Sequence, residues 1–180
     1  MTEFSQDGVT LQFVQGDIAA QDDVEAVVNA ANAQLRTGGG VAGALHRAAG
    51  PGLAEEGRPM APIKPGEVVA TGGHGLPNDA VLHALGPVYG RDSPSDELLA
   101  RCYREALRLA DERGIASVAF PALSTGAFGY PMAEATPVAL GAVRRMLPEL
   151  ETVRTVRFVL FGEDALAMHE RVAGEVFGGA

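Results

Sequence analysis

The sequence predicts an α/β fold in which helices cover both faces of a mostly parallel sheet. Strand-like apolar segments alternate with segments of helical periodicity along the 180 residues, and no repeat interrupts this order. Hydrophobic residues make up 47% of the chain and charged residues 21%, a composition typical of globular proteins. Interleaved strands and helices bury a sheet between two helical layers. The length suits one domain, which we expect to span residues 1–180.

Six segments have the features of strands. Most are short apolar runs bounded by turn residues, and the first ends at Gly16 and Asp17. The segments are 9–15, 25–29, 67–71, 80–85, 117–122 and 155–161. Glycine-rich segments follow several of them, and ligands of such sheets bind beyond the carboxyl ends of the strands. We therefore expect the functional site at that edge of the sheet.

Four segments are predicted as helices, namely 41–49, 95–113, 132–147 and 164–177. Segment 95–113 is clearly amphipathic, with Ser95 as its expected N-cap and Gly114 just past its end. Asp164 is the expected cap of the last helix. Segment 53–65 is rich in Gly, Pro and charge, so it is predicted as a loop with room for one helical turn.

Charge and cysteine content restrict the class of protein. The formal charge is −9, which argues against general nucleic-acid binding but leaves room for a small anion held by backbone dipoles. No apolar run is long enough for a membrane span, and no signal peptide is visible. Cys102 is the single cysteine, so no intrachain disulfide can form and a cytoplasmic location is expected.

The segment 29–50 carries the most information about function. Asn29 and Asn32 precede three glycines, Gly38 to Gly40, and a predicted helix follows. Amides can hold sugar hydroxyls, and glycine-rich backbone before a helix can hold phosphate. Residues 38–43 match the dinucleotide-binding pattern G-x-G-x-x-G, but that pattern should begin directly after a strand, and here eight residues lie between. A Walker A phosphate loop does not fit either, because no GK[ST] occurs. The alternatives are a phosphate loop of another architecture and a flexible turn that caps a helix.

A second loop, 124–131, directly follows the strand 117–122. It contains Ser124, two glycines and two aromatic residues, Phe128 and Tyr130. Two such loops after neighbouring strands favour a clamp for a diphosphate. Ser124 lies in Ala-Leu-Ser-Thr-Gly, which is not the G-x-S-x-G of a nucleophile elbow.

Asp17 and the histidines allow two interpretations each. Asp17 can accept from an exocyclic amine such as that of adenine, or it can cap a turn. His46 follows the glycines and lies within reach of a ligand, or it packs. His83, within VLHAL, is expected to be a hydrogen-bonded core histidine. No HExxH spacing or His–Cys pairing occurs, so no metal site is expected.

Five motifs together resemble a macrodomain, with the closest resemblance to bacterial proteins of the MacroD-like group. They are GDI at 16–18, NAAN at 29–32, GGGVAGALHRAAG at 38–50, GEVVATGGHGLPNDAVLHALGP at 66–87 and PALSTGAFGYP at 121–131. The resemblance covers residues from about 10 to about 165. It implies a three-layer α/β/α sandwich around a mixed, roughly six-stranded sheet, in agreement with the element count.

The resemblance also implies ADP-ribose as the ligand, with no cofactor. By position, Asp17 and Ile18 would bind the adenine, and Phe161 would lie against it. Asn29 and Asn32 would lie by the distal ribose. The two loops would wrap the diphosphate and the distal ribose with Gly38, Gly39, Gly40 and Val41 on one side and Ser124, Thr125, Gly126, Ala127 and Phe128 on the other.

Members of the MacroD-like group resemble hydrolases of mono-ADP-ribosyl esters on acidic side chains and of O-acetyl-ADP-ribose. Asn32 and His46 match their catalytic positions, but Ala42 stands where they carry an aspartate. If that aspartate activates water, its loss could cost on the order of 10²–10⁴ in rate. The ligand's own phosphate could activate the water instead, with Asn32 and the loops positioning it.

Two alternatives remain at this point, a non-catalytic ADP-ribose reader and an ADP-ribose 1″-phosphate phosphatase. Other macrodomain classes fit less well. The poly(ADP-ribose) glycohydrolase class carries a pair of glutamates downstream of the glycine run, but Glu55 and Glu56 are interpreted as part of a solvated loop. Another class uses a lysine in the first loop, and no lysine occurs at 35–37. The expected partners are ADP-ribose or an ADP-ribosylated protein, without nucleic acid or membrane, and the protein is expected to be a monomer.

Overall fold

The computed structural model describes residues 1–178, and in them the chain forms seven strands and five α-helices. The strands are β1 (Thr2–Gln6), β2 (Val9–Gln15), β3 (Ala26–Ala30), β4 (Val68–Gly72), β5 (Ala80–Ala84), β6 (Ser117–Phe120) and β7 (Thr155–Leu160). The helices are α1 (Gly40–Ala49), α2 (Gly52–Gly57), α3 (Ser95–Glu112), α4 (Met132–Met146) and α5 (Glu163–Phe177). Short 3-10 turns are η1 (Ile18–Ala20), η2 (Arg58–Met60) and η3 (Leu147–Glu149).

The strands form one mixed sheet in the order β1-β2-β7-β6-β3-β5-β4. The five central strands from β2 to β5 are parallel, whereas β1 and β4 pair antiparallel at the two edges. The carboxyl ends of the parallel strands therefore meet at one edge, where the loops after β2, β3, β6 and β7 lie.

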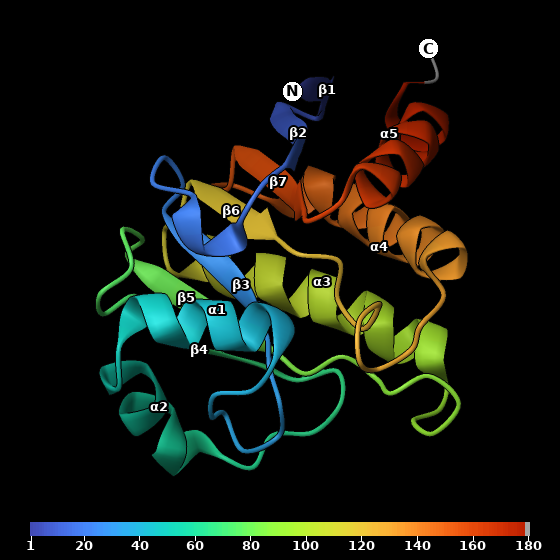
Figure 1. The fold of residues 1–180 in the computed structure, drawn as a ribbon. Helices are drawn as coiled ribbons and strands as arrows, with labels where there is room; N and C mark the ends of the chain where they lie inside the picture. Colours follow the sequence, from blue (N-terminus) through green and yellow to red (C-terminus); the bar gives the residue numbers. More distant parts are fainter. Residues whose placement is uncertain (179–180) are drawn as a thin grey trace.

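Helices cover both faces of the sheet, so the molecule has three layers (Figure 1). On one face α3, α4 and α5 close the larger core, which includes Val28, Leu82 and Tyr103. On the other face α1 and η1 pack on Val27 and Val81. Neighbouring residues of β3 and β5 thus point to opposite cores, as the pleat of a strand requires. The predicted α/β/α sandwich is confirmed.

The seventh strand, β1, is absent from the elements expected from sequence. Its residues alternate between half-buried and exposed, and its register pairs Thr2 with Phe13. Phe4 is its one large apolar side chain, and its ring packs 6.1 Å from that of Phe13. One phenylalanine in TEFSQ gives little strand signal, so the strand is held by pairing with β2 rather than by its own pattern.

Two expected helix caps are wrong. Pro94, not Ser95, is the N-cap of α3, and the Ser95 hydroxyl donates to the carbonyl of Asp92. Gly162 is the N-cap of α5, which places Asp164 inside its first turn, where a carboxylate still favours the helix dipole. Gly114 does end α3 with a left-handed φ of 74°.

The segment after α1 is more helical than predicted. Residues of the expected loop form α2 and η2 in succession, and Glu55 and Glu56 belong to α2. Glu56 is not simply solvated, because one carboxylate oxygen accepts from His74 Nε2 at 2.7 Å and from the Gly72 amide at 3.1 Å. Within residues 1–178, no helix is both long and apolar enough to cross a membrane.

Candidate functional site

The first glycine loop owes its position to a close backbone contact. A Cβ atom at Gly43 would lie 2.4 Å from the Gly38 carbonyl oxygen, so the loop folds back onto the first turn of α1 in a way only glycine permits. Gly40 has a φ of 56°. Within the part of the chain that the structure describes, the amides of Gly40, Val41 and Ala42 make no backbone bond outside the helix, as expected at a helix N-terminus. These amides and the helix dipole form a site for an anion.

Asn32 closes the base of this loop. Its amide nitrogen donates to the Arg36 carbonyl at 2.8 Å, and its amide oxygen accepts from the Arg36 amide at 3.1 Å. A Cβ atom at Gly38 would lie 3.5 Å from the Asn32 side-chain nitrogen. Asn32 and the glycines therefore lie side by side, as the sequence led us to expect.

Asn29 is placed differently from Asn32, because its side chain is buried on the sheet face below α1. Its Nδ2 donates to His83 Nδ1 at 3.0 Å, and His83 Nε2 lies 2.9 Å from the Thr71 hydroxyl. Burial lowers the pKa of His83 from 6.5 to about 4, so the ring is neutral at pH 7. Nδ1 must then accept and Nε2 must donate. This chain of bonds fixes the Asn29 amide, whose oxygen has no hydrogen-bond partner among the described residues. The prediction that His83 is a hydrogen-bonded core residue is confirmed.

Two further buried polar atoms near this edge, His46 Nε2 and Ser124 Oγ, have no hydrogen-bond partner among residues 1–178. His46 lies one turn after Ala42 on the buried face of α1, and burial lowers its pKa. Ser124 has a left-handed φ of 66°, and a Cβ atom at Gly86 would lie 2.1 Å from its hydroxyl. Buried polar atoms are seldom left unpaired in proteins, and those that are call for an explanation such as a bound water, ion or ligand.

The second loop, 124–129, is closed by its own backbone. The Tyr130 amide donates to the Ser124 carbonyl at 2.9 Å, and the Gly129 amide donates to the Gly126 carbonyl at 3.0 Å. The amides of Gly126, Ala127 and Phe128 make no backbone bond within residues 1–178. They form a second set of donors at the same edge of the sheet.

Phe128 connects the two loops. Its ring packs against the small core of Ala31, Leu35, Ile63 and Leu85, which supports the first loop from below. Its carbonyl accepts from the Tyr89 amide at 2.9 Å. The two sets of free amides are therefore held by a shared apolar support.

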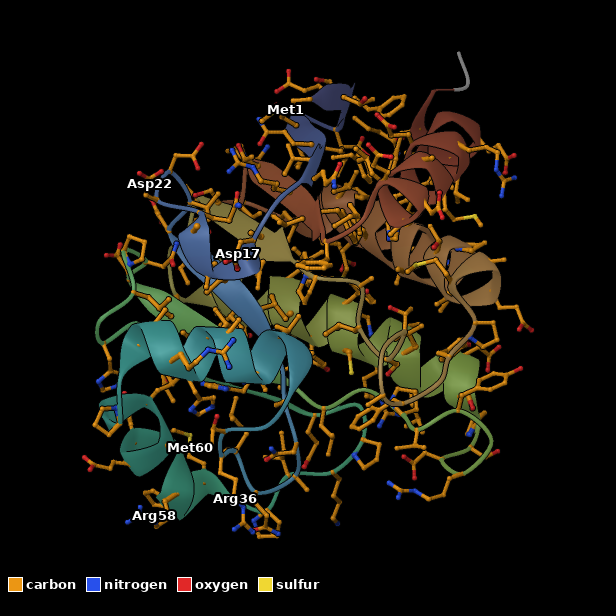
Figure 2. All side chains as sticks on the ribbon, in the orientation of Figure 1. Met1, Asp17, Asp22, Arg36, Arg58 and Met60 are labelled. Carbon is orange, nitrogen blue, oxygen red and sulfur yellow. The ribbon has the colours of Figure 1, made fainter. Side chains whose placement is uncertain are left out.

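At the other end of the site, Asp17 caps η1 through a bond from the Ala19 amide to its Oδ1 at 2.9 Å. The interpretation of Asp17 as a turn cap is thus correct, and its other carboxylate oxygen, Oδ2, is available to accept a further hydrogen bond. Ile18 is buried. Phe161 follows β7, and the Gly16 amide donates to the Leu160 carbonyl at 2.9 Å, so Phe161 lies near Asp17. Phe161 is 93% exposed, which is a high value for a phenylalanine. In Figure 2, Asp17 and Arg36 lie on either side of α1.

Arg157 is a residue of this region that sequence reasoning missed. It is buried in β7, and its guanidinium donates twice to the Asp23 carboxylate at 2.7 Å. It also donates to the side-chain oxygen of Gln21, whose nitrogen donates to the Asp17 carbonyl. The bond to Arg157 lowers the pKa of Asp23. An arginine within an apolar strand was the available signal, because a buried charge needs a partner.

Ala42 is buried, 5% exposed, on the face of α1 that carries His46, and it offers only a methyl group there. No group of three or more potential metal ligands occurs within the described residues. Cys102 is fully buried in α3, as predicted, and burial raises the pKa of its thiol to about 12.

Comparisons with known proteins agree with this architecture. The Macro domain family model matches residues 28–139. A macro domain-containing protein of Methanosarcina mazei is 44% identical over 156 residues, which are 86% of this chain and 83% of that protein. The O-acetyl-ADP-ribose deacetylase of Enterobacter cloacae is 41% identical over 167 residues, covering 90% of this chain and 92% of that enzyme.

Solved structures give the same result. A mutant of the Oceanobacillus iheyensis macrodomain with ADPR has a TM-score of 0.94 at 35% identity, and 99% of each chain is covered. The Trypanosoma brucei macrodomain in complex with ADP-ribose has a TM-score of 0.85 at 38% identity, covering 91% of this chain and 69% of that one.

The sheet order, the three layers and the paired loops define an α/β sandwich with two sets of free backbone amides at the carboxyl ends of its strands. The chain belongs to the macrodomain family.

Proposed function

We propose that the protein binds ADP-ribose along the edge formed by the loops after β2, β3, β6 and β7. The observation that carries this proposal is the pair of free amide sets, at Gly40 to Ala42 and at Gly126 to Phe128. Amides that approach from two loops are suited to the two phosphates of a diphosphate. Two relatives with solved structures hold ADPR or ADP-ribose.

The adenine would lie at the end of the site near Asp17. The free Oδ2 of Asp17 can accept from the exocyclic amine, and the exposed ring of Phe161 offers a face for stacking. Ile18 supplies its backbone beside them. The distal ribose would lie at the opposite end, between Asn32 and Phe128, with Asn29 below.

We further propose that the protein hydrolyses mono-ADP-ribosyl esters of acidic side chains, O-acetyl-ADP-ribose or both. For a protein ester, the water oxygen attacks the anomeric carbon of the distal ribose, and the bond from that carbon to the ester oxygen breaks. The acidic side chain leaves as a carboxylate, and the water proton passes to a phosphate oxygen of the ligand and then to solvent. Asn32 and the two loops position the water, and the neutral imidazole of His46 supports it.

One observation favours a second function, that of a reader which holds ADP-ribose without useful turnover. Ala42 supplies no carboxylate on the helix face that carries His46. The two functions share one site and differ only in the fate of the water. The deacetylase relative favours the enzyme.

Calorimetric titration with ADP-ribose tests binding. We expect saturable heat for the wild type, a clear loss of affinity for Asp17→Ala, and a loss for Asp17→Asn, which keeps the cap oxygen for the Ala19 amide. Phe161→Ala should weaken binding by about 5- to 150-fold, since stacking on a base contributes about 1–3 kcal/mol. Because Phe161 is exposed, its loss should leave the unfolding temperature unchanged. Absence of any heat at millimolar ligand would refute the proposal.

Release of labelled ADP-ribose from a glutamate-linked ADP-ribosylated protein tests catalysis. A wild-type rate above buffer supports the hydrolase, and a rate equal to buffer leaves the reader. Ala42→Asp separates two routes to catalysis. A large gain in rate shows that the missing carboxylate limits the enzyme, whereas an unchanged rate supports activation of water by the ligand's phosphate.

We propose one ADP-ribose-binding domain over residues 1–180, acting as a monomer in the cytoplasm. The single cysteine, buried and unpaired, is in keeping with a reducing compartment. Size-exclusion chromatography with light scattering tests the monomer.

A further inference from the structure

The charges of this chain are distributed unevenly around the site. The whole chain has 14 Lys and Arg against 23 Asp and Glu. Residues 31–66, which carry the first glycine loop, α1 and α2, reverse this balance, with four Lys or Arg and two Glu. A cationic stretch of an acidic protein therefore surrounds the end of the site that holds Asn32.

Three of these cations, Arg36, Arg58 and Lys64, form what we call the cationic rim. The Arg36 backbone is bonded to the Asn32 side chain. A Cβ atom at Gly57 would lie 3.2 Å from Leu35 Cβ, so Gly57 and Leu35 are in close contact. Arg58 follows Gly57 and Arg36 follows Leu35, which brings the two arginines near each other. Lys64 follows Ile63, whose amide donates to the Ala33 carbonyl at 3.0 Å. Figure 2 shows Arg36 and Arg58 at the same end of the molecule, below α1.

The rim is exposed, and its positive charge is not neutralised by ion pairs. All three side chains are exposed, and none of the ion pairs among residues 1–178 includes them. Of the nearest glutamates, Glu56 accepts from His74 and Gly72, whereas the Glu67 carboxylate accepts from the backbone amide of Lys64 and lies beside the rim. Glu55 on α2 is the other carboxylate of this region.

We propose that the cationic rim binds an acidic polypeptide segment around the ADP-ribosylated side chain. The inference rests on the proposed function, because a polypeptide joined to the distal ribose must leave the site beside Asn32 and hence past Arg36. An ester on Asp or Glu in an acidic segment brings further carboxylates to this place. Nucleic acid fits less well, since three cations on a chain of charge −9 give little counterion release.

The test compares two peptides that carry ADP-ribose through a hydrolysis-resistant linkage, one flanked by Asp and Glu and one by Asn and Gln. At low salt we expect the acidic peptide to bind about 3- to 10-fold more tightly, as a few exposed ion pairs allow. The preference should shrink at high salt. Arg36→Gln with Arg58→Gln should abolish it while leaving free ADP-ribose binding unchanged. The matched control is Arg144→Gln with Arg145→Gln, an exposed pair at the far end of α4, which should keep the preference.

Each other outcome overturns a stated part of the inference. Equal affinity for the two peptides, with free ADP-ribose still bound, overturns the rim and leaves the proposed function intact. No binding of free ADP-ribose overturns both. An equal loss in the control pair assigns the effect to overall charge. Tighter, rim-dependent binding of an oligonucleotide with ADP-ribose on its terminal phosphate replaces the polypeptide by nucleic acid.

Discussion

Gly43 shows how one missing carbon atom can set the shape of a binding loop. Its Cα lies against the Gly38 carbonyl, and the guanidinium of Arg47 would lie 3.0 Å from an added Cβ atom. The G-x-G-x-x-G match pointed to these glycines from sequence alone. It could not show that the third glycine serves a contact within the loop, because that contact depends on how residues 33–38 fold back.

Gly43→Ala should therefore displace the first loop. We expect ADP-ribose affinity to fall by about 10-fold or more, because the free amides at 40–42 lose their alignment with the second loop. Calorimetry measures the affinity. Gly141→Ala is the matched control, since a Cβ atom there has no neighbour within 4 Å in α4 and should leave affinity unchanged. Unchanged binding in Gly43→Ala would show that the loop adapts at no cost.

His83 should make the free energy of unfolding depend on pH. Its pKa is about 4 when folded and 6.5 when exposed, so the unfolded chain binds more protons between these values. The stabilisation is fully present above pH 6.5 and is lost as the pH falls towards 4, by on the order of 3 kcal/mol. Burial lowers the pKa of His46 and His169 in the same direction.

Urea denaturation from pH 7 to pH 4 measures this dependence. His83→Gln should flatten it, whereas His169→Gln should retain most of the slope. The same slope in His83→Gln and the wild type would contradict the assignment to His83. The sequence indicated a core histidine here, but the direction of its hydrogen bonds depends on Asn29 and Thr71 in neighbouring strands, which no local pattern reveals.

Among the elements, those with a continuous apolar pattern were predicted well, and those held by their neighbours were not. The bounds of β2 and β5 were predicted to within a residue, because the apolar side chains that are buried in these strands form a clear pattern in the sequence. β1 was missed, since pairing with β2 supplies its stability. The segment of α2 was predicted as a loop with room for one helical turn, because Gly52 and Gly57 at its two ends are weak helix formers. Gly57 packs closely on Leu35, and a larger residue at this position would crowd the Leu35 side chain.

The loop from Asp17 to Asp23 is another element held from outside. Arg157 of β7 reaches Gln21 and Asp23, and the Asn78 side chain donates to the carbonyls of Gln21 and Val24. The sequence predicted that Asp17 follows a strand and can cap a turn, and Asp17 does follow β2 and cap η1. It did not reveal what holds the loop, because these partners lie more than 50 residues away along the chain.

Arg157→Met should loosen this loop. We expect a loss of about 1–3 kcal/mol of stability in urea denaturation, the usual range for bonds to a charged group, together with weaker ADP-ribose binding. Arg171→Met is the control, because Arg171 is exposed and its pair with Glu175 spans 3.8 Å, so its loss should stay within about 0.5 kcal/mol. Equal stability of the two variants would show that the Arg157 contacts contribute nothing.

For the whole molecule, ligand binding should raise the unfolding temperature. Ligand at 100 times its Kd stabilises the folded state by about 2.7 kcal/mol, which for a chain of this size is about 5–10 °C. Thermal melting with increasing ADP-ribose measures the shift. AMP at the same concentration should shift the temperature less, since it lacks the second phosphate and the distal ribose. Equal shifts would show that only the adenine end is bound.

The position of β1 against α5 has a practical consequence. Phe4 and Phe177 lie with their rings 6.4 Å apart, and the Thr2 hydroxyl donates to Glu170. Figure 1 shows this pair of elements at the side of the molecule remote from the loop before α1. A tether to a sensor chip or a fused fluorescent reporter placed beside β1 thus leaves the first glycine loop open to solution.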